Sequence, residues 1–161
     1  TPHERKVRAG TALWNHQRGL DFLCHLDAVD SDRLATIGQG YGGANAVLLA
    51  AFDHRIKASA AACAYGPGSG DVSPLAPVAP PAWTWIEILA LIAPRAFHYA
   101  FAADADDTTV ADDMIELGRL YDLLGCRDKL STFTSPEAGS YPSAARREAY
   151  AMFKRVLQSD R

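Results

Sequence analysis

The chain has 161 residues, of which 48% are hydrophobic, and a formal net charge of -3 at pH 7. This length allows a substantial buried core, and we expect a single domain over residues 1–161. Basic residues form no block and do not alternate with aromatic residues, which argues against nucleic-acid binding. The apolar runs are too short to span a bilayer. Three cysteines lie far apart without a Cys-x-x-Cys pair, which favours small buried side chains over a disulfide or zinc framework.

The first part of the chain predicts an alternation of helices and strands. Apolar residues spaced among polar ones predict an amphipathic helix over residues 13–26, and a polar turn separates it from a short strand, Leu34–Ile37. A glycine-rich turn leads into Ala44–Phe52, a helix of small and apolar residues that we expect to be buried. Ala58–Ala64 is mostly alanine, and its position after a buried helix favours a central strand.

The second part of the chain begins with a segment rich in proline and glycine. Residues 66–81 hold five prolines and three glycines, so we predict a long surface loop. Helical periodicity resumes over Trp83–Ile92, and Ala96–Ala102 predicts a strand with aromatic residues at alternate positions. A helix with one apolar face follows and ends near Gly125, a plausible C-cap. A strand over Leu130–Phe133 and a final amphipathic helix complete the chain.

The order of these elements predicts an α/β fold, with a mostly parallel sheet and helices on both faces. About four strands are visible in the sequence, which is few for a doubly wound sheet. The chain has no internal repeat and no sign of a second domain.

The stretch Thr36–Gly43 reads Thr-Ile-Gly-Gln-Gly-Tyr-Gly-Gly and joins an expected strand to an expected helix. A G-x-S-x-G turn at such a junction displays the nucleophile of a serine hydrolase. Here Gly38 and Gly42 occupy the outer positions, but Gly40 stands at the centre. Because glycine has no side chain, no acyl intermediate can form there. The sequence predicts the turn of a hydrolase without its attacking atom.

Three further stretches resemble the C-terminal half of α/β-hydrolases, in particular the branch of dienelactone hydrolases and acetyl-xylan esterases. These stretches are Val29–Gly38, Ala50–Ala58 and Ile88–Arg95, and the similarity extends over most of residues 10–158. The resemblance implies an α/β-hydrolase-like fold whose N-terminal strands are missing from this chain. It also implies that any activity would be directed at ester bonds.

The resemblance places Gly40 where the family has its nucleophilic serine. The family's histidine corresponds to Ser140, in a segment that reads Ala-Gly-Ser-Tyr. A triad needs a nucleophilic oxygen, an imidazole that takes its proton and a carboxylate that orients the imidazole. Two of the three positions therefore depart from the family's pattern. The backbone N–H of Tyr41 corresponds to one donor of the oxyanion hole.

The triad acid corresponds to Asp106, and Asp104 and Asp107 are alternatives because a shift of one residue stays open. The same three aspartates could suggest a cation site. The glycine and glutamate that an EF-hand loop requires are absent, so we expect a solvated acidic loop near a helix N-terminus and no metal.

Other candidate residues favour structural roles. The five histidines form no His-x-x-x-His pair, which argues against zinc. His98 lies within a predicted strand, where we expect a satisfied structural histidine. It is a less favoured candidate for a relocated base, since ligands usually bind at the carboxyl ends of strands. Cys63 is expected in mid-strand without a base, so burial is its expected role.

The glycines at the elbow also permit a different reading. Gly38, Gly40 and Gly43 satisfy G-x-G-x-x-G, the dinucleotide fingerprint, which requires an acid about 20 residues further on. The next strand carries no acid at its end, and the first one after it is Asp71, inside the predicted loop. We therefore expect no cofactor, and nucleotide binding is kept as the second alternative.

These observations favour a catalytically degenerate serine-hydrolase-like protein that acts as a binding or structural subunit. The first alternative is an active carboxylesterase whose missing groups come from another segment or chain. Without the family's upstream strands, the first strand has an unpaired edge. There we expect a partner chain, a second copy or a truncation boundary. The chain opens on Thr1 and not on methionine, which indicates processing or excision.

Overall fold

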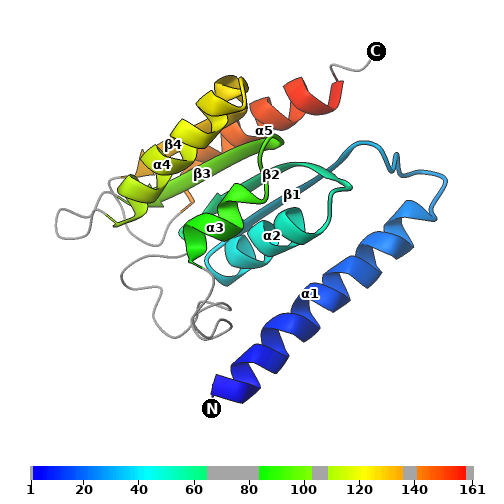
Figure 1. The fold of residues 1–161 in the computed structure, drawn as a ribbon. Coiled ribbons are helices and arrows are strands. Elements are labelled where there is room, and N and C mark those ends of the chain that lie inside the picture. Colours follow the sequence, from blue (N-terminus) through cyan, green and yellow to red (C-terminus); the bar gives the residue numbers. More distant parts are fainter. Residues whose placement is uncertain (1, 65–83, 103–108, 136–140, 159–161) are drawn as a thin grey trace.

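The computed structural model describes residues 2–64, 84–102, 109–135 and 141–158. The predicted loop 66–81 lies outside the described residues. Four strands form one parallel sheet in the order β1-β2-β3-β4, and helices lie on both of its faces (Figure 1). The predicted α/β fold is confirmed.

The strands are β1 (Leu34–Gln39), β2 (Ile56–Ala62), β3 (Ala96–Ala102) and β4 (Leu130–Ser135). The helices are α1 (Pro2–Cys24), α2 (Tyr41–Phe52), α3 (Trp85–Ala90), α4 (Thr109–Leu123) and α5 (Ser143–Gln158), and a 3₁₀ turn, η2 (Arg127–Lys129), precedes β4.

The predicted elements are present, but some boundaries were wrong. The first helix begins at Pro2, well before residue 13, and ends at Cys24. The strand predicted over Ala58–Ala64 instead ends at Ala62, because Cys63 adopts a φ of 48° that interrupts an extended chain. The predicted cap is confirmed: Gly125 has a φ of 68° just beyond the end of α4.

The strand order decides where the helices lie. Consecutive strands are neighbours, and the order runs in one direction across the sheet. Right-handed crossovers between parallel strands then place the connecting helices on the same face. Accordingly α2, α3 and α4 pack on one face, with α1 against α2. The last helix, α5, covers β2 and β3 on the opposite face.

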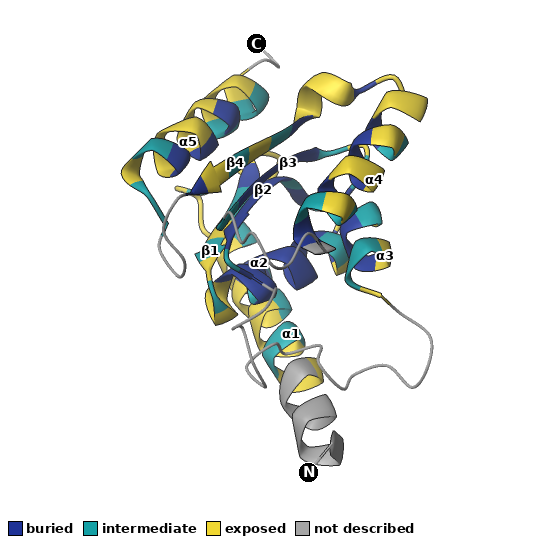
Figure 2. Cartoon of the chain, turned by 90° about the vertical axis from the view of Figure 1, so that its left-hand side faces the viewer, coloured by how far each residue is buried: buried dark blue, intermediate teal, exposed yellow. Residues whose placement is uncertain are grey.

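Strand β2 and helix α2 are largely buried (Figure 2). The two faces of the sheet have different cores. Under α2, α3 and α4 lie large buried side chains, among them Phe97 and Tyr99 of β3 and Tyr121 of α4. Under α5 the sheet presents mainly alanines, which form two small clusters with residues of α5: Ala58, Ala60, Ala62, Ala96, Ala100, Ala145, Ala149 and Met152. Alanine buries little apolar area, so the α5 face contributes less hydrophobic free energy for each residue in contact.

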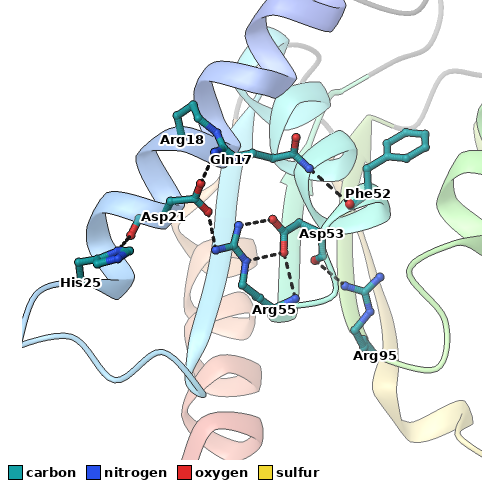
Figure 3. A network of polar contacts seen from close by, with 8 residues as sticks. All are labelled: Gln17, Arg18, Asp21, His25, Phe52, Asp53, Arg55 and Arg95. Carbon is teal, nitrogen blue, oxygen red and sulfur yellow. Dashed lines mark hydrogen bonds and ion pairs between the residues drawn. The ribbon is translucent and has the colours of Figure 1, made fainter.

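A charged network at the amino ends of the strands joins α1 to the turn between α2 and β2 (Figure 3). Asp53, only 6% exposed, follows α2 directly. Its carboxylate accepts hydrogen bonds from Arg55 Nε at 2.9 Å and Arg55 Nη2 at 2.6 Å. Arg55 Nη1 donates to Asp21 of α1 at 2.7 Å. The guanidinium therefore holds the first helix and the turn together.

Arg95 fixes the start of β3 through four backbone carbonyls. Its Nη1 donates to the carbonyls of Asp53 at 3.2 Å and Ile56 at 2.9 Å. Its Nη2 donates to Leu91 at 3.0 Å, and its Nε donates to Ile92 at 3.2 Å. The planar fork of an arginine presents donors in several directions at once, which a lysine does not. Arg95 thus joins the segment after α3 to the beginning of β2.

We predict that Asp53→Asn lowers the free energy of unfolding by about 1–3 kcal/mol at pH 7, because Arg55 loses a charged acceptor in a buried position. The pKa of Asp53 lies below its ordinary value of 3.8, chiefly because Arg55 donates hydrogen bonds to it. The stabilisation is therefore complete above pH 3.8 and is lost as the pH falls through the lower pKa of the folded state. Urea denaturation at neutral pH and along an acid series measures both effects.

The matched control is Asp30→Asn. Asp30 also pairs with an arginine, Arg33, but the two side chains are 46% and 41% exposed, so the change should have little effect on stability. Equal stabilities for wild type and Asp53→Asn at pH 7 would contradict a stabilising role for the network.

Candidate functional site

The chain turns sharply between β1 and α2, as the glycine motif predicts. Gly40 lies at this junction with a φ of 54° and a ψ of -124°, a region in which residues with side chains are strained. Its N–H donates to the carbonyl of Ala62 at 2.8 Å, and its carbonyl accepts from the N–H of Ala44 at 3.0 Å. The elbow is thus held by backbone hydrogen bonds on both sides.

Two other glycines of the elbow are required by close packing. A Cβ on Gly38 would lie 2.6 Å from the nitrogen of Gly43 and closer still to the carbonyl group of Gly42. A Cβ on Gly43 would lie 3.1 Å from the carbonyl oxygen of Ala62 and 3.2 Å from Cβ of Ala64. Backbone packing therefore accounts for glycines that also fit the dinucleotide fingerprint.

The central position of the elbow is sterically open. A Cβ built on Gly40 would meet no heavy atom within 4 Å. The backbone can therefore present a side chain there without a clash, at the cost of its strained conformation. The turn has space for a side chain at Gly40, but glycine supplies none for nucleophilic chemistry.

The elbow stands at the carboxyl ends of the strands, where open α/β sheets usually bind ligands. Tyr41, the predicted backbone donor, begins α2, and its side chain is exposed. The other predicted triad positions fall after β3 and β4. Asp106 lies in 103–108, together with Asp104 and Asp107, and Ser140 lies in 136–140; both segments are outside the described residues.

The structure corrects the prediction for Cys63. Its thiol was expected in mid-strand and buried, but the residue lies just beyond β2 and is partly exposed. It follows Ala62, whose carbonyl binds Gly40, so it stands beside the elbow. The N–H of Cys63 donates to the carbonyl of Ala100 at 2.9 Å, and the N–H of Ala64 donates to the hydroxyl of Tyr99 at 3.1 Å.

His98 was predicted to be a satisfied structural histidine, and only one of its two ring nitrogens has a partner among the described residues. It is completely buried in β3, away from the carboxyl end of the strand. Its Nδ1 lies 2.9 Å from Oγ of Ser131, whereas Nε2 has no hydrogen-bond partner among the described residues. Burial lowers the pKa of the imidazole from its ordinary value.

Metal-binding side chains do not gather within the described ranges. No group of three or more histidine, cysteine, aspartate or glutamate residues there could hold a metal ion. The three cysteines are free thiols. In the same part of the chain, none of the helices has both the length and the apolar character needed to cross a bilayer.

Comparison with known proteins identifies the architecture. No family model and no curated protein matches the sequence. Among solved structures, the chain is similar to Methylesterase BT1017, with a TM-score of 0.80 and 22% identity over 98% of this chain and 37% of that chain. It is also similar to the glucuronoyl esterase catalytic domain from Hypocrea jecorina, with a TM-score of 0.72 and 16% identity over 92% of this chain and 51% of that chain.

A third similar structure is a carbohydrate esterase family 15 glucuronoyl esterase from Caldicellulosiruptor kristjansonii. It has a TM-score of 0.67 and 14% identity, over 92% of this chain and 50% of that chain. These proteins are α/β-hydrolase-fold enzymes, and this chain has part of that fold. It spans 37% of the methylesterase and about half of the glucuronoyl esterases.

We predict that Gly38→Ala lowers the free energy of unfolding by about 1–3 kcal/mol, because the new methyl group overlaps backbone atoms of α2 that cannot move separately from the helix. Gly42→Ala is the matched control. Its Cβ would meet nothing within 4 Å, so this variant should be as stable as the wild type or slightly more stable. Thermal and urea denaturation of the two variants measure the difference. Equal stabilities would contradict the close approach at Gly38.

Proposed function

We propose that this chain is a catalytically degenerate serine-hydrolase-like protein that serves as a binding or structural subunit. One observation carries the proposal: the elbow keeps its strained backbone at Gly40 and has open space there, but no side chain. Acyl transfer by a triad begins with attack by a side-chain oxygen, so the reaction has no first step at this position. The resemblance supports the same conclusion at Ser140, where a hydroxyl replaces the expected imidazole.

A second candidate is an active esterase whose nucleophile and base come from another segment or chain. This candidate is favoured because the solved esterases are longer: the part that matches this chain is 37% of one and 51% of another. Under this candidate the substrates would be of the kind that those names state, methyl or glucuronoyl esters. The two candidates differ in whether any serine is activated, and where it lies.

We predict that the native protein does not react with a fluorophosphonate probe, because that reaction requires an activated serine. The probe-treated protein is digested, and adducts are mapped by mass spectrometry, with hydrolysis of p-nitrophenyl acetate followed in parallel. A covalent adduct on any residue bordering the elbow would contradict the degenerate-enzyme proposal. An adduct on a distant serine, or on a chain that co-purifies, would contradict it too and would favour the second candidate.

Restoring the missing side chain gives a complementary prediction. Gly40→Ser should fold, with a cost of about 1–2 kcal/mol from its left-handed backbone, because its Cβ meets nothing within 4 Å. Combined with Ser140→His, it should react weakly with the probe. The reaction should be slow, because Tyr41 supplies one identified donor of the oxyanion hole and a single donor changes the rate by about 10²–10³.

The control for restoration places the same hydroxyl two residues away. Gly42→Ser with Ser140→His adds the same groups, but Gly42 lies outside the central position of the elbow, and a Cβ added there would also meet nothing within 4 Å. This pair should stay unlabelled. Equal labelling of both pairs would mean that Gly40 is not the nucleophile position.

The role as a subunit is supported by the exposed edge of the sheet. Among the described strands, β1 pairs only with β2, so its other side presents peptide groups that another strand could bind. Ile37 of β1 is 39% exposed, and α1, on the same side of the molecule in Figure 1, exposes Trp14 and Phe22. We propose that a partner chain or a second copy completes the sheet here.

We predict that Ile37→Lys disrupts this association without unfolding the chain, because a charge on an edge strand opposes strand addition. Light scattering after size-exclusion chromatography should give the wild type a mass above the 17.3 kDa of one chain and the variant the mass of one chain. Leu123→Lys on α4, at a side chain 83% exposed and on a different element, is the control and should behave as the wild type. A wild type with the mass of one chain at all concentrations would contradict pairing with a second copy.

A further inference from the structure

The buried imidazole of His98 lies at the interface between the sheet and α5. Ala60 and Ser131 are its register partners on β2 and β4, and the surrounding alanines Ala58, Ala60 and Ala96 contact Ala149 and Met152 of α5. No part of His98 is exposed to solvent. A titratable ring is thus enclosed between one helix and the centre of the sheet.

Only one of the two ring nitrogens has a partner among the described residues. Nδ1 is 2.9 Å from Oγ of Ser131, and Nε2 is buried without an acceptor or donor. In the neutral ring the less costly arrangement has Nδ1–H donating to Ser131 and leaves Nε2 as a bare acceptor. Protonation would add a charged N–H at Nε2 inside an interface of methyl groups. An unpaired buried donor that carries charge is among the most unfavourable groups in a protein.

The contact that holds α5 in place is small and separate. Its buried residues, Ala145, Ala149 and Met152, lie over alanines and belong to clusters distinct from the main core on the opposite face. Because these clusters are separate from the main core, release of α5 would leave the packing of α2, α3 and α4 intact.

We propose that α5 is an acid-released cover of the sheet, and that His98 is the group whose protonation releases it. When α5 leaves, Nε2 reaches water and the charged ring is solvated. The release also exposes the alanine-lined face of β2 and β3, which continues to Ala35 of β1. This inference does not depend on the proposed function.

The charges around His98 are few. Burial lowers the pKa of the imidazole, and the negative charge of Glu148 on α5 acts in the opposite direction. Arg155 lies two helical turns beyond Glu148, on the same side of α5. The facing residues of β2 are alanines, and β4 presents Ser131 and Phe133, none of which titrates. Burial raises the pKa of Tyr141, before α5, to about 12, so it stays neutral.

The sign of the pH effect follows from this lowered pKa. The released state has the ordinary histidine pKa of 6.5, and the docked state has a lower one. The stabilisation of the docked helix is therefore complete above pH 6.5 and declines as the pH falls toward the pKa of the docked state. Within this window the opening equilibrium increases up to about tenfold for each pH unit.

Hydrogen exchange measured by mass spectrometry between pH 5 and 8 tests the proposal, with rates corrected for the intrinsic pH dependence. Protection of peptides from Ser143–Gln158 should fall by up to about tenfold for each pH unit below 6.5, while protection of Tyr41–Phe52 stays constant. Protection of α5 that is independent of pH would overturn the proposal. An equal loss in both helices would also overturn it, since that is global unfolding.

Three variants assign the effect to His98. His98→Leu should remove the pH dependence of α5, and His54→Gln, at an exposed histidine, should leave it unchanged. Glu148→Gln removes a solvent-exposed negative charge that raises the pKa of His98. Without it the pKa of the docked state is lower still, so α5 should be less protected from exchange at pH 5 than in the wild type. Should His98→Leu fail to fold, Glu148→Gln and the NMR titration of the His98 ring decide: an unaltered α5 in Glu148→Gln, or a His98 pKa at or above 6.5, would overturn the proposal.

Discussion

The structure depends on the direct contact between β1 and the first turn of α2. Gly38 lies so close to the backbone of Gly42 and Gly43 that no side chain fits between them. This approach forces the reversal at Gly40 and places α2 across β1 and β2, where it covers the start of the main core. The elbow is therefore a packing requirement of the fold, whether or not a nucleophile stands at its centre. A glycine at that centre also avoids the strain that a residue with a side chain would meet in this conformation.

The two ends of the parallel strands carry different interactions. At the amino ends, Asp53, Arg55 and Arg95 bind one another and the backbone, so the charges there are used within the fold. At the carboxyl ends, the elbow leaves open space at Gly40. This division agrees with the usual position of ligand sites in open α/β sheets.

The faces of the sheet differ as much as its ends. Aromatic and aliphatic side chains fill the space below α2, α3 and α4, whereas alanines allow α5 to approach β2 and β3 closely. His98 is completely buried between these elements, and Ser131 is its partner among the described residues. Because the imidazole is surrounded by small apolar side chains, a positive charge on the ring would be unfavourable there. The same alanines bury little apolar area, which limits the hydrophobic free energy that holds α5 in place.

The sequence by itself determined the order of strands and helices, the parallel sheet, the cap at Gly125 and the elbow with Gly40 at its centre. These features follow from local patterns: periodicity, glycine positions and a short motif at a strand–helix junction. Only the tertiary structure decided that Gly38 touches α2, that Cys63 lies beyond its strand, that Arg95 binds four carbonyls and that Nε2 of His98 is enclosed without a partner. Two of these features depend on atoms far apart in the chain: Arg95 binds the carbonyls of Asp53 and Ile56, and His98 is enclosed by β2, β4 and α5. No local pattern encodes which distant backbone or side chain will occupy the space beside a given residue.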